Sequence, residues 1–123
     1  METTEQYLIE YKAFIDSYKR SEVSGEEVGE LIARMAQYFA MQNLKTVACE
    51  RDMYIIGKDI ESRADEGGKV ISSAKAQAII SATPEADKYR TARAHRDNIE
   101  QCINALKSLQ KGVLSEYISQ GNT

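Results

Sequence analysis

Apolar residues recur in steps of four and three from Val28 to Ile60, and this spacing constrains the fold of the chain more than any other feature. Such steps average 3.5 residues, so a helix over this stretch turns one face to a neighbouring helix along its whole length. Eight of the ten positions on that face are apolar: Val28, Ile32, Met35, Phe39, Gln42, Thr46, Cys49, Met53, Ile56 and Ile60. The spacing predicts one long helix over about 25–66 that packs against a second helix.

The same spacing returns near the C-terminus and identifies that second helix, over about 84–119. Its face carries Tyr89, Ala92, Arg96, Ile99, Ile103, Leu106, Gln110, Val113 and Tyr117. An antiparallel arrangement in which facing residue numbers add to about 152 puts Gln42 opposite Gln110. Two amides in one layer satisfy each other and fix the register of a coiled coil. We therefore expect a long antiparallel hairpin with Gln42 and Gln110 as its register layer.

Two shorter helices complete the predicted fold. Thr3 and Gln6 form a capping box for a helix over about 4–20, whose apolar face carries Tyr7, Tyr11, Phe14 and Tyr18. We expect this face to pack on the hairpin or on another copy of the chain. On the hairpin it would lie along the open side, which is broadened by Leu31, Tyr38, Leu44, Val47, Ile55, Cys102, Leu109 and Leu114. Gly67 and Gly68 end the long helix with a left-handed cap, and a short helix over about 72–81 precedes the helix start at Thr83 and Pro84.

Together these elements predict an all-α fold in one domain, 1–123: a coiled-coil-like antiparallel hairpin, an N-terminal amphipathic helix packed on it and a short helix at its tip. A two-helix seam buries too little apolar surface to offset the ordering of so many residues. The broad apolar faces therefore also predict a homo-oligomer.

Composition narrows the location and chemistry of the protein. No run approaches the ~18 apolar residues of a membrane span, and no signal-peptide pattern opens the chain, so we expect a cytoplasmic protein. Cys49 and Cys102 stand alone, as expected of two reduced, buried thiols. His95 is the only histidine, and no Glu lies three residues before it, which excludes a diiron bundle site. We expect no catalytic residue, metal or cofactor.

A group of basic residues near the predicted hairpin tip raises the alternative of nucleic-acid binding. It comprises Lys88, Arg90, Arg93 and Arg96, with Lys58 and Arg63 brought close by the antiparallel fold. Acidic residues share the region, and the whole chain carries a net charge of −3. The sequence therefore favours a solvated face with internal ion pairs over a phosphate-binding surface.

Four carboxylates support a second alternative. Glu27 and Glu30 stand one turn apart, and Glu61 and Asp65 follow about thirty residues on. The arrangement resembles the magnesium-binding carboxylates of all-helical nucleotide pyrophosphohydrolases of the MazG type, which implies a metal-dependent activity on nucleoside triphosphates. The second pair departs from the family's spacing, and helix capping also accounts for the first.

The second half of the chain resembles a recurrent type of small helical protein of bacteriophages and prophages. The resemblance covers Gly67–Tyr117: Gly67 to Val70, the alanine-rich 72–76, the acidic start at 83–85, and the run from Asn98 to Leu109. It implies a bacterial host and a setting in phage DNA metabolism or host takeover. The expected function is therefore a non-enzymatic, self-associating helical protein that binds another protein.

Overall fold

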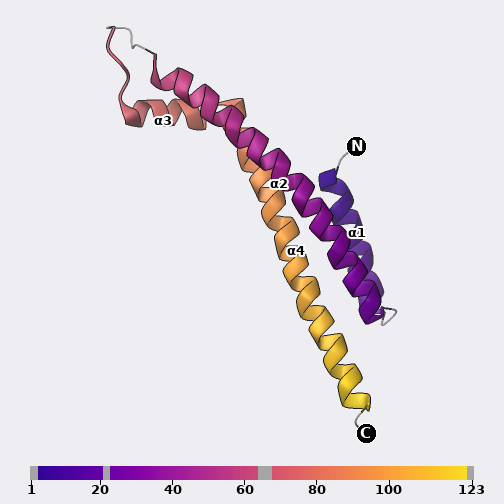
Figure 1. Cartoon of the computed structure of the whole chain (residues 1–123). Helices are drawn as coiled ribbons and strands as arrows, with labels where there is room; N and C mark the ends of the chain where they lie inside the picture. Colours follow the sequence, from indigo (N-terminus) through magenta and orange to yellow (C-terminus); the bar gives the residue numbers. More distant parts are fainter. Residues whose placement is uncertain (1–2, 21–22, 64–67, 122–123) are drawn as a thin grey trace. The chain divides into compact units, whose positions relative to one another are not determined.

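The structure is a computed structural model that describes residues 3–20, 23–63 and 68–121, with side chains described for 6–20, 23–63 and 68–112. Four helices follow one another: α1 (Thr3–Lys19), α2 (Gly25–Glu61), α3 (Ser73–Ser81) and α4 (Pro84–Gly121) (Figure 1). The described ranges contain no β-strand. The predicted all-α fold is confirmed, and α2 packs against α4 as a helical hairpin.

Side-chain caps explain where three of the helices begin. The Ser24 hydroxyl accepts a hydrogen bond from the Glu27 N–H at 3.3 Å, and the Ser72 hydroxyl accepts one from the Lys75 N–H at 3.2 Å. The Thr83 hydroxyl accepts from the Ala86 N–H at 3.1 Å, directly before Pro84. Each bond satisfies a backbone donor that has no partner within its own helix. The helix start predicted at Thr83 and Pro84 is therefore confirmed, and Ser24 and Ser72 cap α2 and α3 in the same way.

The end of α2 differs from the prediction. The helix stops at Glu61 rather than near residue 66, and Gly67 lies outside the described residues. Gly68 does have the expected left-handed conformation, with φ of +81°, but it sits in the connection to α3 and does not cap α2. The connection is closed by a hydrogen bond from the Ile71 N–H to the Arg63 carbonyl oxygen at 3.4 Å. Glycine is suited to φ above zero wherever the chain turns, so its presence predicted a turn but not the residue where the helix ends.

The predicted seams of the two long helices face inward. All ten seam positions of α2 are buried or half-buried, and so are the seven described positions of the α4 seam, from Tyr89 to Gln110. Gln42 and Thr46, the two polar residues of the α2 seam, are each only 2 % exposed. The four–three spacing therefore identified the correct faces of both helices.

The chain forms two compact units: unit 1 joins 1–42 to 95–123, and unit 2 is the continuous segment 43–94. Each unit has its own core. In unit 1, the core consists of Tyr7, Val28, Leu31, Met35, Ile99 and Leu106, all at most 1 % exposed. In unit 2, Ile60, Ala76 and Ile80 form the core, with Met53, Ile56 and Ile71 packed against it. The prediction of a single domain stays a prediction.

Helix α3 packs on the last turns of α2. A Cβ added at the buried Gly57 would lie 3.4 Å from Ile80 Cδ1, so a glycine at this position allows the α3 side chain to approach the α2 backbone closely. Ile60 and Ile80 belong to the same core. The final turns of α2 are thus covered by α3 (Figure 1).

The predicted register of the hairpin is wrong. A Cβ added at Gly29 would lie 3.2 Å from Gln110 Nε2, so Gln110 faces Gly29. Gln42 lies 13 residues further along α2, a separation of roughly 20 Å. In unit 2 the Tyr89 hydroxyl donates to Glu50 at 3.1 Å. The numbers in both pairs add to 139 instead of about 152.

The displacement between the predicted and the observed register has a physical cause. A four–three seam repeats every seven residues, so a displacement of roughly two heptads leaves the same faces in contact. The periodicity therefore determined which faces meet but not their axial position.

The predicted packing of α1 is confirmed over Leu31, Tyr38, Cys102 and Leu109, which share its core, but it is wrong over the middle of α2. Leu44, Val47 and Ile55 are 73 %, 44 % and 60 % exposed. Helix α1 instead contacts the first turns of α2, where the Arg34 Nε lies 2.7 Å from Glu10 Oε1.

None of the helices, over the residues that the structure describes, contains a stretch long and apolar enough to cross a membrane.

Candidate functional site

The middle of α2 carries large side chains on the face opposite its seam. Leu44, Val47, Tyr54 and Ile55 are 44–73 % exposed, and Arg51 and Lys58 are exposed among them. At 100° per residue these six positions fall within an arc of about 100° centred opposite the buried seam. We call this set the outer stripe: Leu44, Val47, Arg51, Tyr54, Ile55 and Lys58. It lies entirely within unit 2 and spans about 21 Å of helix.

The outer stripe is an ordered surface rather than a frayed end. It lies within α2, whose opposite face is buried from end to end, so the backbone holds the six side chains at fixed spacing. Exposed apolar residues that occur singly are ordinary, whereas a contiguous ordered patch is typical of a binding surface. The stripe is therefore the first candidate functional site.

The charges on the outer stripe are positive at its centre. Arg51 makes no hydrogen bond or ion pair with any residue that the structure describes. The Lys58 Nζ lies 5.3 Å from the centroid of the Tyr54 ring. Two carboxylates beside the stripe are already engaged: Glu50 accepts from the Tyr89 hydroxyl, and Asp59 pairs with Arg63 at 2.8 Å.

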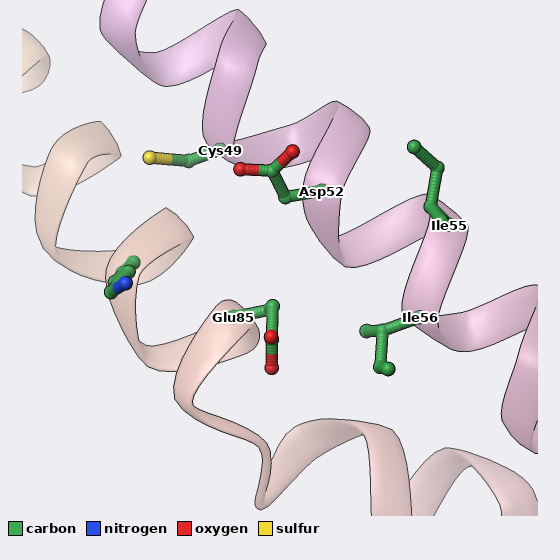
Figure 2. A pocket seen from close by; sticks show the side chains of 6 residues that line it. Cys49, Asp52, Ile55, Ile56 and Glu85 are labelled. Carbon is green, nitrogen blue, oxygen red and sulfur yellow. The ribbon is translucent and has the colours of Figure 1, made fainter.

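A pocket of about 270 Å³ lies next to the stripe, between α2 and the start of α4. It is lined by Cys49, Asp52, Ile55, Ile56, Glu85 and Lys88. Figure 2 shows Cys49 and Asp52 reaching from α2 and Glu85 reaching from α4. Asp52 thus contributes to the pocket, with the Lys88 ammonium group in the same lining. The pocket combines two carboxylates with one cation and two aliphatic side chains.

In unit 1, a polar clamp joins α1 to α2. Glu10 accepts hydrogen bonds from two residues one turn apart: the Arg34 Nε–H at 2.7 Å and the Tyr38 hydroxyl. The bond to Glu10 is the main reason that the pKa of Tyr38 is raised, because it holds the phenol proton. The clamp fixes α1 along α2 at one position.

A second pocket, of about 350 Å³, lies beside this clamp and contains the first carboxylate pair of the pyrophosphohydrolase resemblance. Glu27 and Glu30 line it together with Glu10, Arg34 and Phe14. The Ser24 hydroxyl also donates to Glu27 Oε1 at 3.3 Å, so Glu27 takes part in the cap of α2. Asp65 lies outside the described residues. No group of three or more His, Cys, Asp or Glu side chains in the described part of the chain is placed to hold a metal ion.

The structure does not gather the predicted basic patch on one face. Lys88 lines the pocket beside α2, whereas Arg90 and Arg93 lie roughly 140–200° further around α4. Ion pairs join Arg63 to Asp59 at 2.8 Å and Arg90 to Asp87 at 3.5 Å, both in unit 2. In unit 1, Arg96 pairs with Asp97 at 3.6 Å. Of the remaining members, Arg93 stacks on the Tyr89 ring at 5.2 Å and Lys58 belongs to the outer stripe.

The aromatic face of α1 is mostly used inside unit 1. Tyr7 is fully buried, and Tyr11 and Phe14 pack against the same core. Tyr18 is 38 % exposed and stacks on Phe14 with ring centroids 6.5 Å apart. Three of the four aromatic side chains therefore serve the core of this chain, and Tyr18 is the exposed member of the face.

Two buried polar atoms in unit 1 lack hydrogen-bond partners among the described residues: Tyr7 Oη and His95 Nδ1. The two rings meet edge to face with centroids 6.5 Å apart. Burial raises the pKa of Tyr7, partly opposed by the Asn98 side chain nearby, and burial also raises the pKa of the Cys102 thiol. These groups form the polar part of an otherwise apolar core.

Comparison with known proteins adds no family to this description: no protein-family model, curated protein or solved structure matches the chain. The sequence pattern did not predict the outer stripe, because Leu44, Val47 and Ile55 also fit a broad buried face. The sequence does contain a pattern that indicates the stripe. Leu44, Val47, Arg51, Tyr54 and Lys58 follow their own four–three spacing opposite the seam.

Proposed function

We propose that this chain is a helical protein-interaction module and that the outer stripe of α2 is its binding surface. The observation that carries the proposal is the exposure of four large apolar side chains on one face of an ordered helix: Leu44, Val47, Tyr54 and Ile55. Transfer of such side chains from water to a partner's surface stabilises a complex by the hydrophobic effect.

The two alternatives have weaker support. Three of the six predicted phosphate-binding cations, Arg63, Arg90 and Arg96, already pair with carboxylates, which reduces the charge available to a nucleic acid. The pyrophosphohydrolase reading requires Glu27 and Glu30 to bind a metal ion. These two carboxylates share a pocket with the Arg34 guanidinium, whose positive charge lowers the attraction of the pocket for a cation. The protein-interaction function therefore has the best support.

Site-specific photo-crosslinking in the native cell tests the proposal. The full chain carries a benzoylphenylalanine at Leu44 or at Ile55, and a control chain carries it at the exposed Lys107 in unit 1. We expect protein adducts from positions 44 and 55 only, and loss of the adducts when Val47→Glu is added. A circular-dichroism melt of each variant shows that the fold is kept. Absence of adducts, or equal adducts from Lys107, refutes the proposal.

The mass of the adduct also identifies the kind of association. An adduct of twice the chain mass of 13.8 kDa supports an interaction module that self-associates, as the sequence predicts. An adduct of any other mass supports an interaction module that binds a different protein.

A further inference from the structure

Within the proposed interaction function, on which this inference rests, we infer that the outer stripe binds an acidic amphipathic helix of another protein. The shape of the stripe defines the first part of this statement. It is a straight, convex helix face about four turns long, with large side chains at three- and four-residue steps. Such a face accepts the ridges of a second helix lying alongside it.

The apolar side chains define which residues that helix carries toward the stripe. Leu44, Val47 and Ile55 are aliphatic, and Tyr54 adds an aromatic face. Aliphatic residues of the partner at four–three spacing would fill the spaces between them, as in any helix–helix seam. The occupant is therefore amphipathic, with one aliphatic face about four turns long.

The charges on the stripe define the sign of the charge that the partner helix carries. Arg51 stands at the centre of the stripe without an intramolecular partner in the described residues, and Lys58 is the last residue of the stripe. Of the nearby carboxylates, Asp59 is paired with Arg63, and Glu50 accepts a hydrogen bond from the Tyr89 hydroxyl about 100° around the helix from Arg51. Asp52 lines the pocket (Figure 2), and Glu61 is exposed at the last residue of α2. A partner helix with carboxylates beside its aliphatic face thus meets two cations directly.

The position of Arg51 argues against a second copy on this surface. An isologous dimer places the residue at the centre of its interface beside its own symmetry mate. The stripe runs from 44 to 58, so the residue at its centre is Arg51, in parallel and antiparallel pairings alike. Two unpaired guanidinium groups would then meet inside an apolar contact, which is unfavourable.

Fluorescence anisotropy with two labelled helical peptides tests this inference on the full chain. The acidic probe has 21 residues, with leucine at the a and d heptad positions and glutamate at e and g. The basic probe has lysine at every glutamate position. We expect the acidic probe to bind at least about tenfold more tightly than the basic one, with affinity that falls as salt increases.

Charge-reversed variants sharpen the test. Arg51→Glu with Lys58→Glu should reverse the preference between the two probes, whereas Lys107→Glu, an equal type of change in unit 1, should alter affinity less than about twofold. Equal binding of both probes, no binding of either, or unchanged preference in the reversed variant overturns the inference. Stripe-specific crosslinks in the native cell would leave the interaction function standing in those cases. A stripe-dependent dimer seen by sedimentation would also overturn the acidic-partner assignment.

Discussion

Replacement of Tyr7 by phenylalanine tests whether the core of unit 1 contains an unpaired polar group. The ring is fully buried, and its hydroxyl makes no hydrogen bond of normal geometry with the described residues, although the Asn98 side chain lies near enough to lower its pKa. Tyr7→Phe removes that hydroxyl and leaves the ring contacts with the core in place. Most substitutions at a buried position destabilise a protein. We expect Tyr7→Phe, in contrast, to stabilise the protein.

The magnitude follows from two opposing terms. A buried polar group without a partner costs about 1–3 kcal/mol of folding free energy. Removal of the oxygen leaves a void on the order of 10 Å³, which costs only about 0.2 kcal/mol. The free energy of unfolding should therefore rise by about 1 kcal/mol, and Tm should rise by about 3–5 °C for a chain of this length. Loss of the whole ring in Tyr7→Ala should instead cost about 3–5 kcal/mol.

Urea unfolding followed by circular dichroism at pH 7 measures both changes. Tyr54→Phe is the matched control, because Tyr54 is 63 % exposed and its hydroxyl can bond to water. The control should change the free energy of unfolding by less than about 0.5 kcal/mol. A loss of 1 kcal/mol or more in Tyr7→Phe would show that the hydroxyl is hydrogen-bonded and would refute the reasoning.

Three further predictions concern a cap, an ion pair and alkaline pH. Thr83→Ala removes the cap of α4 and should lower the free energy of unfolding by about 1 kcal/mol. Thr91→Ala, at an exposed position inside α4, should not lower the free energy of unfolding. Equal losses in the two variants would contradict the cap. A double-mutant cycle on Glu10 and Arg34 should give a coupling of about 0.2–1 kcal/mol that shrinks in high salt, and zero coupling would contradict the clamp. Burial raises the pKa of Cys102 above its ordinary 9.0, and the pKa of Tyr7 is raised above 10.0. Raised values favour the protonated folded state, so this stability is fully present below pH 9 and is lost as pH rises through the raised pKa values. Cys102→Ala should move the onset of that loss to higher pH in urea titrations; the same onset in both proteins would contradict the assignment.

Local sequence patterns predicted the helices well. Hydroxyl caps at Ser24, Ser72 and Thr83 act on backbone donors within the next turn, so three residues of sequence are enough to identify them. The seams of α2 and α4 were also predictable, because each depends only on the spacing of apolar residues along one helix.

Axial position and coverage were not predictable in the same way. The axial position that brings Gln110 beside Gly29 is not encoded by any single-helix pattern. Leu44 and Val47 fit a broad apolar face as well as they fit a second, outward one. Only the location of α1 distinguishes these two arrangements. For the same reason the candidate binding surface emerged from the structure and not from the sequence.

The division of the chain into a continuous and a discontinuous unit has a consequence for biosynthesis. Unit 2 is one uninterrupted segment, so its contacts need only short loops to close and can form early. The core of unit 1 joins Tyr7 to Ile99 and Leu106, so it stays incomplete until the chain has left the ribosome as far as Leu106. During that interval the apolar faces of α1 and of the first turns of α2 lack their final cover, which exposes the nascent chain to aggregation or to capture by chaperones.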